Sequence, residues 1–293
     1  MGRLMKCSTG VALVFLAGVV WSVQGLIIKS IHDAGPWAVL YWRSAGMVPV
    51  LLLWLAVGAR GRVWAQMRSA GLAGVLGGIG LVMAFSGAIH AFQTTSVANA
   101  VVLFTASPFF AAVLGRALLR EAVPVVTWVA MALAVLGVGV LVGGGMAGGS
   151  LSGNAAALLS ALGFAGFTVT CRWGKLTNML PAVLLGGIFA LLTGALATQV
   201  LGQPLLIPPR DIALAAAMGA VTLSGGLILF TIGSRVVPAA QATLISLVEV
   251  LLAPVWAYAV LGEVAATGTL IGGAVLLAAV VMNAYGGRKT PGA

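Results

Sequence analysis

A single carboxylate lies near the middle of a long apolar stretch. The segment LISLVEVLLAPVWAYAVLGE, residues 244–263, carries Glu249 among aliphatic and aromatic residues, in a chain with only five acidic residues. A charged side chain at the centre of a bilayer costs roughly 2.5–3.5 kcal/mol on insertion scales, so Glu249 must meet a partner, line a water-filled cavity or stay protonated. Pro254 removes the helix hydrogen bond to the Val250 carbonyl beside it. This combination predicts a substrate or proton site; the alternative is a structural carboxylate hydrogen-bonded to a neighbouring helix.

Two helical faces carry the side chains that accompany this carboxylate, because residues three or four positions apart share one side of a helix. The later face consists of Ser246, Glu249 and Trp256, and the earlier one of Phe104 and Ser107. We expect the two faces to confront each other. Pro108 and Pro254 interrupt the two helices and are the predicted hinges.

Arg43 is the other charge that lies deep in an apolar stretch. Its guanidinium suits a bidentate contact with a substrate carboxylate. It also suits the alternative, in which the long side chain extends to the membrane surface and leaves only its methylene stem in the bilayer. The sequence leaves both interpretations open.

The remaining candidates are aromatic or weakly polar. Those near the middle of their spans are Trp21, Ser22, Met83, Phe164 and Thr222, and His90 shares a face with Met83 nearer the outer end. A mostly apolar pocket with few fixed polar groups suits small amphipathic metabolites better than bare ions. Each of these aromatic residues has the alternative role of packing or lipid contact, and a lone histidine near a helix end is commonly structural or interfacial.

The elements that carry these residues read as membrane spans. Hydrophobic residues make up 61% of the chain and charged residues 7%, whereas soluble domains carry roughly 25% charged residues. A span needs about 20 mostly apolar residues. The breaks between apolar runs predict ten spans, at 10–30, 36–57, 70–91, 95–118, 124–144, 151–172, 180–201, 211–233, 238–261 and 266–286.

The distribution of lysine and arginine orients these spans. With the N-terminus inside, twelve basic residues lie on the cytoplasmic side, and only Lys29 and Arg210 lie outside. This agrees with the positive-inside rule and predicts an N-in, C-in topology. The same bias accounts for the net charge of +10 without a nucleic-acid partner.

The two halves of the chain resemble each other. The segment ANAVVLFTASPFFAAVLGRALLREAV (98–123) aligns without gaps on AQATLISLVEVLLAPVWAYAVLGEVA (240–265), a shift of 142 residues that places Ser107 on Glu249. Five spans per half is an odd number, so the second half must insert upside down. We predict two repeats, at residues 1–145 and 146–293, that together form one all-α membrane domain around a central cavity.

This pattern resembles the EamA-type branch of the drug/metabolite transporter superfamily. The shared features are a late helix in each half with small residues at its start, a central proline or acidic position and a terminal glutamate, followed by a helix rich in glycine and alanine; they cover residues 95–142 and 237–285. The chain departs from the family by having Glu249-Val250 where glutamate-proline is usual. Within the family it is similar to YddG-like exporters of aromatic and other amino acids.

The resemblance implies a secondary transporter of the bacterial cytoplasmic membrane that exports amino acids or similar metabolites. Broad drug/metabolite and nucleotide-precursor carriers of the same superfamily are alternatives, as is a channel or structural helix bundle. The sequence lacks GxSxG, HExxH and phosphate-loop motifs, so we expect no enzyme activity and no cofactor or metal. The expected partners are a small-molecule substrate, membrane lipid and protons as the coupling ion.

Overall fold

The protein folds into helices that pack side by side. The computed structural model describes residues 7–31, 33–58, 62–94, 100, 103–142, 150–174, 178–261 and 267–286, and these residues contain no strand. In chain order the helices are α1 (Cys7–Ser22), α2 (Gln24–Lys29), α3 (Pro36–Gly58), α4 (Val63–Thr94), α6 (Ser107–Leu119), α7 (Val125–Val142), α8 (Leu151–Trp173), α9 (Leu180–Val200), α10 (Pro209–Ala217), the π-helix η1 (Met218–Leu223), α11 (Ser224–Gly233), α12 (Ala239–Ser246), α13 (Val248–Leu261) and α14 (Thr267–Gly286).

Five helical stretches in the described residues are long and apolar enough to cross a membrane by themselves. They are Pro36–Gly58, Val63–Ala91, Leu151–Trp173, Leu180–Val200 and Pro209–Gly233. The other apolar helices are shorter, in part because α1 is separated from α2 at Val23, and α12 from α13 at Leu247. The count of ten spans stays a prediction, and the boundary expected between residues 145 and 146 lies outside the described residues.

Local sequence signals explain where several helices start. Pro181 and Pro209 lie in the first turns of α9 and α10, where the missing N–H of proline has no helical partner to lose. Ser150 precedes α8, and its hydroxyl oxygen accepts a hydrogen bond of 3.0 Å from the Gly153 N–H. This contact satisfies one of the N–H groups that a helix start leaves free.

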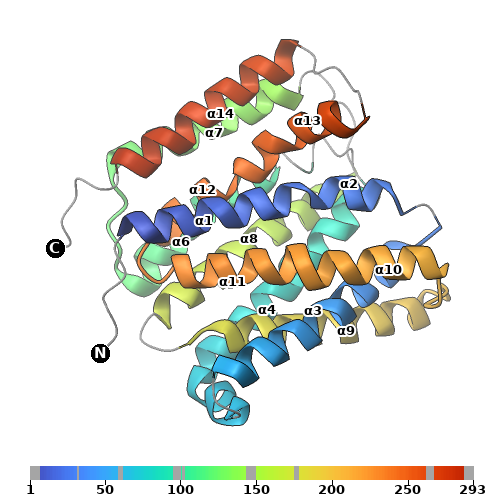
Figure 1. Cartoon of the computed structure of the whole chain (residues 1–293). Coiled ribbons are helices and arrows are strands. Elements are labelled where there is room, and N and C mark those ends of the chain that lie inside the picture. The colour runs from blue at the N-terminus through green and yellow to red at the C-terminus, as the bar shows by residue number, and fades with distance from the viewer. Residues whose placement is uncertain are drawn as a thin grey trace.

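Helices of the first half pair with helices of the second half. The pairs are α1 with α11, α3 with α9, α4 with α8, α6 with α12, and α7 with α14. In the α7–α14 pair, Thr127 donates a hydrogen bond of 3.1 Å to Asn283, whereas Gly137 approaches Leu276. The two helices are therefore antiparallel, and Figure 1 shows them side by side along one edge of the bundle.

Many large apolar side chains face outward. Among them are Trp54 at 51% exposed, Leu196 at 61% and Val221 at 67%, each on a helix that is long enough to span a bilayer. A soluble monomer rarely leaves so much apolar surface in water. The outer surface of this bundle is therefore suited to lipid.

Candidate functional site

Two helices are interrupted at equivalent places in the two halves. Residues Thr105 and Ala106 form a turn directly before α6, and Leu247 forms a turn between α12 and α13. The 142-residue shift that relates the halves carries Thr105 onto Leu247. Interrupted helices in membrane transporters expose backbone groups and helix ends near bound substrates. The matched breaks therefore mark the candidate site.

Pro108 and Pro254 lie at different positions relative to the two breaks. Pro108 lies in the first turn of α6, directly after the turn, so it starts a helix rather than kinking one. The second break lies at Leu247 and not at Pro254, because α13 is helical through position 254; the side chain of Pro254 itself is outside what the structure describes. At Leu247 the N–H donates to the Leu244 carbonyl in a tighter turn, and the Leu247 carbonyl accepts from both Val250 and Leu251.

Each break places a predicted site residue in the first turn of the following helix. Glu249 is the acidic residue in the first turn of α13, where the positive end of the helix dipole favours a carboxylate. Its side chain is half-buried and has no hydrogen-bond or ion-pair partner among the described residues. Ser107 takes the equivalent place in α6; it is buried, and its hydroxyl has no partner in the described part of the chain.

Helix α1 covers the break beside Glu249. A Cβ atom on Gly18 would lie 3.0 Å from the Ser246 carbonyl and 3.5 Å from the Glu249 nitrogen, so only glycine lets the two backbones approach this closely. Farther along, the Trp256 Nε1 donates a hydrogen bond of 2.7 Å to the Ser22 hydroxyl. Glu249, Ser22 and Trp256 therefore gather between α1 and α13.

An aromatic cluster adjoins this place on α1. The Trp21 ring lies 5.8 Å from the Phe164 ring of α8 and 5.6 Å from the Phe230 ring of α11, measured between centroids. Trp21 also packs against Gly226, where a Cβ would overlap the indole, and its Nε1 donor is buried without a hydrogen-bond acceptor among the described residues. The cluster can present flat apolar surface together with one free donor.

Arg43 lies inside the bundle rather than at a membrane surface. Its side chain is only 8% exposed, and its guanidinium carbon lies 4.8 Å from the centroid of the Phe85 ring of α4. The snorkelling alternative is therefore wrong. Its backbone is held equally closely: a Cβ on Gly219 of η1 would overlap the Arg43 carbonyl, so α3 and the π-helix touch backbone to backbone.

The other sequence candidates occupy separate surroundings. The hydroxyls of Thr222 and Ser246 are buried and donate to the carbonyls of Met218 and Thr243 in their own helices. Met83 is partly buried beside Gly163 of α8, His90 is partly buried and its carbonyl accepts from Thr94, and Phe104 packs with Ala100 and Ala157. Ser246 also lies against α1, since its carbonyl is close to Gly18.

The expected confrontation of the two faces occurs over only part of their length. Helices α6 and α12 both contribute alanines to shared apolar clusters: Ala111 and Ala239 belong to one, and Ala112 and Ala240 to another. The part of the later face that carries Glu249 and Trp256 packs against α1 instead. Sequence reasoning also missed Phe85 and Phe230, because an aromatic residue in an apolar helix carries no signal of which neighbour it will touch.

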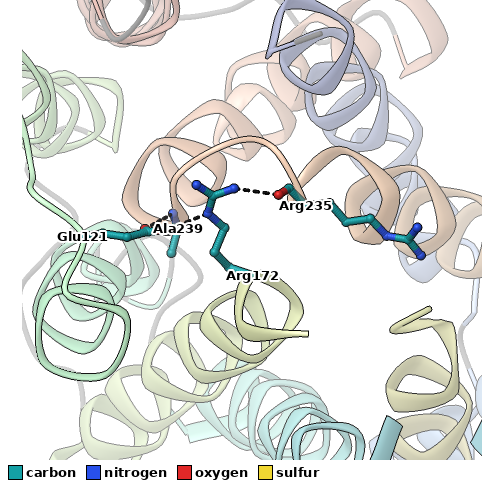
Figure 2. Close-up of polar contacts among 4 residues, drawn as sticks. All are labelled: Glu121, Arg172, Arg235 and Ala239. Atoms are coloured by element: carbon teal, nitrogen blue, oxygen red, sulfur yellow. Dashed lines mark hydrogen bonds and ion pairs between the residues drawn. The ribbon is translucent and has the colours of Figure 1, made fainter. Parts of the chain in front are cut away.

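A polar network ties the two halves together at one end of the bundle. Arg172 of α8 donates through Nε to Glu121, and through Nη1 to the Arg235 carbonyl at 2.6 Å. The second oxygen of Glu121 accepts from the Ala239 N–H at 3.3 Å. Figure 2 shows the Arg172 guanidinium between Glu121 and the Arg235 carbonyl, with the Arg235 guanidinium pointing away.

The network continues through the side chain of Arg235. Its Nη2 donates to Asn178 at 3.0 Å, and Asn178 in turn donates to Gln66 of α4 at 3.0 Å. A small pocket lies beside Glu121, between α6, α7 and α12. The chain of contacts thus joins segments from both halves.

Known proteins match the chain at the level of family and fold. The family model described as the EamA-like transporter family matches residues 8–143 and again residues 151–285. A solved structure described as "Crystal structure of protein" is similar with a TM-score of 0.82 and 17% sequence identity, over 96% of this chain and 98% of that chain. At this identity the likeness concerns the fold alone. No curated protein matches the chain.

Proposed function

Because the chain belongs to the EamA-like transporter family, a branch of the drug/metabolite transporter superfamily, we propose that it is a secondary active exporter of amino acids or similar small amphipathic metabolites. The family and the apolar helices make it a multi-pass membrane protein with a small-molecule substrate. We place it in a bacterial cytoplasmic membrane. A broad-specificity drug or nucleotide-precursor carrier is the second candidate, which the same family match favours.

The proposed architecture has ten spans in two inverted repeats. Its support is the pairing of helices: α1 packs on α11 as α4 packs on α8, the equivalent helices α3 and α9 pack on each other, as do α7 and α14, and α6 packs on α12, a segment of the other interrupted helix. A twofold axis in the membrane plane that exchanges the halves produces this set of pairs. In Figure 1 the start of α1 and the end of α14 lie at the same end of the bundle, as an N-in, C-in topology requires.

The observation that carries the proposed function is the pair of matched helix breaks. They place Glu249 and Ser107 in the first turns of α13 and α6, and farther along α13 Trp256 contacts Ser22 of α1. Half-helices that start inside a membrane protein offer N–H groups and dipole ends to a bound molecule. A proton on Glu249 is the proposed coupling ion, since this carboxylate has no partner in the described residues.

The test is substrate exchange in liposomes. Purified protein is reconstituted with unlabelled amino acid inside, and uptake of radiolabelled tryptophan, phenylalanine, methionine, threonine and glutamate is measured against empty liposomes. We expect saturable exchange of aromatic or apolar amino acids. Glu249→Gln should abolish it or remove its dependence on pH, because glutamine keeps the shape of the side chain but cannot release a proton.

Asp33→Asn is the matched control for this variant. It makes the same carboxylate-to-amide change at an exposed position, where the contact with Asp211 uses the backbone N–H of residue 33. The control should exchange substrate like the parent. Exchange by Glu249→Gln at an unchanged rate and with unchanged pH dependence would refute the coupling role. Absence of exchange with every amino acid would move the substrate to the drug and metabolite class.

A further inference from the structure

The guanidinium of Arg43 is buried with two of its donors unused. Both Nε and Nη2 are inaccessible to solvent and have no hydrogen-bond acceptor in the described part of the chain. These two nitrogens form one edge of the planar guanidinium, and their N–H groups point in nearly the same direction. That edge matches the two oxygens of a carboxylate.

No carboxylate of the described chain compensates this charge. Glu121 pairs with Arg172, Asp211 accepts from the Asp33 N–H, and neither Asp33 nor Glu249 forms an ion pair with Arg43. The face of Phe85 offers only a weaker attraction to the cation. A buried charge without a counterion destabilises a fold, so this arrangement is explained if a ligand brings the missing anion.

The surrounding structure holds the arginine in place before any ligand arrives. Gly219 of η1 lies directly against the Arg43 backbone, and on the next turn of α3 a Cβ on Gly46 would overlap the Ala216 carbonyl. These contacts leave the α3 backbone little freedom to move. Segments of π-helix inside α-helices often occur at functional sites, and η1 is such a segment.

Phe85 supplies an apolar ring beside Arg43. It packs against the same apolar core that contains Trp21 and Phe230, and Phe164 packs against that core as well. A ligand whose anionic end met Arg43 would therefore have flat apolar surface next to it.

From this geometry we propose that Arg43, backed by Phe85, is the anion subsite of the transport site, and that the substrate carries a carboxylate attached to an apolar or aromatic body. The inference rests on the proposed transport function and specifies its substrate class. It predicts that the carboxylate is required for recognition.

The first experiment uses the unaltered protein. In the liposome exchange assay, uptake of labelled phenylalanine is challenged with unlabelled phenylalanine, phenylalanine amide, phenethylamine and 3-phenylpropionate. The amide and the amine lack the carboxylate, so they lose a charged hydrogen-bonded contact. The concentration of either that halves the uptake should be about 10- to 100-fold higher than that of unlabelled phenylalanine. The carboxylate-bearing competitors should stay effective. Equal competition by acid and amide would overturn the proposal.

Variants at Arg43 test whether this residue causes the preference for a carboxylate. Arg43→Lys keeps the charge but loses the two-donor edge, so it should raise the KM at least about tenfold. In Arg43→Gln, the acid and the amide should compete equally well with labelled phenylalanine. Arg210→Gln, at an exposed arginine in the first turn of α10, should behave like the parent. Retention of the normal acid preference by Arg43→Gln would overturn the assignment.

A stability measurement separates this role from a structural one. Removing an uncompensated buried charge should leave the thermal stability of detergent-purified Arg43→Gln unchanged or higher. In the same assay 3-phenylpropionate, but not 3-phenylpropionamide, should stabilise the parent protein and not the variant. If the protein exchanges no amino acid, this binding difference still tests the subsite apart from the transport proposal. A destabilised variant, or equal stabilisation by acid and amide, would contradict it.

Discussion

Glu249 and Arg43 are charges of opposite sign that lie between helices without an ionic partner in the described part of the chain. Their surroundings differ. Arg43 is enclosed by α3, Phe85 and the π-helix, whereas Glu249 is half-buried at the start of α13. The other described carboxylates lie in loops or at helix ends. At the scale of single residues, the lack of an ionic partner therefore distinguishes Glu249 and Arg43 from the paired Glu121 and Arg172.

Trp256→Phe tests the contact between α1 and α13 at this scale. The substitution removes the N–H that donates to Ser22 and keeps most of the apolar ring. A hydrogen bond between membrane helices contributes about 1 kcal/mol, so the variant should melt a few degrees below the parent in detergent and show a raised KM for exchange.

The control for this variant is Trp54→Phe. Trp54 is 51% exposed on the outer surface of α3, so its loss should change neither the melting temperature nor the KM. Equal effects of the two substitutions would show that the hydrogen bond between Trp256 and Ser22 contributes neither to the melting temperature nor to the KM.

At the scale of elements, the proposed site depends on helices that are not uniform. The breaks at Thr105–Ala106 and Leu247 place first turns inside the bundle, and η1 changes the helix geometry next to Arg43. Glycines then bring these irregular segments against their neighbours: Gly18 meets the α12–α13 break, and Gly46 and Gly219 join α3 to α10 and η1. Small residues at helix contacts compensate for the weak hydrophobic drive between helices in lipid.

Gly46→Ala tests the close packing of α3 on α10. Alanine favours a helix over glycine, yet a Cβ at this position would overlap the Ala216 carbonyl. Overpacking of this kind costs about 1–3 kcal/mol, so the variant should lose thermal stability in detergent.

Gly139→Ala is the matched substitution for comparison. It makes the same change in α7 at a position where a Cβ would meet nothing within 4 Å. Its stability should equal or exceed that of the parent. If both variants were equally stable, the backbone contact between α3 and α10 would not be as close as described.

At the scale of the whole molecule, the two halves are held together at the end predicted to face the cytoplasm. Glu121 and Arg172 are 19% and 18% exposed, so their contact is shielded from water and salt. Glu121 reaches it because Arg120 ends α6 with φ of 54°, a left-handed conformation that turns the chain back toward α8 and α12. Alternating access requires such a closed end to open.

Glu121→Gln should favour opening at this end. Cys171 is a native reporter because it is fully buried and adjacent to Arg172. The exposed Cys7 is first replaced by serine. In inside-out vesicles an impermeant maleimide should then label Cys171 about tenfold faster in Glu121→Gln than in the Cys7→Ser parent, since a charged hydrogen bond is lost.

Arg116→Gln, an exposed change on α6 just before Glu121, serves as the control and should not alter the labelling rate. Addition of transported substrate should change the rate in the parent, because substrate shifts the balance of the two access states. A labelling rate that is the same in all variants and conditions would count against a gate at Glu121 and Arg172.

The sequence by itself determined the helices and the resemblance between halves, and it singled out Glu249 and Arg43 as candidate site residues. Helices form through local hydrogen bonds in apolar runs, and prolines such as Pro181 and Pro209 start them, so this information is contained in neighbouring residues. A charge in such a run is recognisable because lipid cannot solvate it.

Only the tertiary structure decided which residues meet. Trp256 and Ser22 are 234 positions apart, and Phe85 reaches Arg43 from another helix. These contacts depend on how glycine-lined surfaces fit and on the rotation of each helix about its axis. The break at Leu247 rather than Pro254 has the same origin, since packing against Gly18 of α1 accompanies it. Local patterns do not encode these long-range fits.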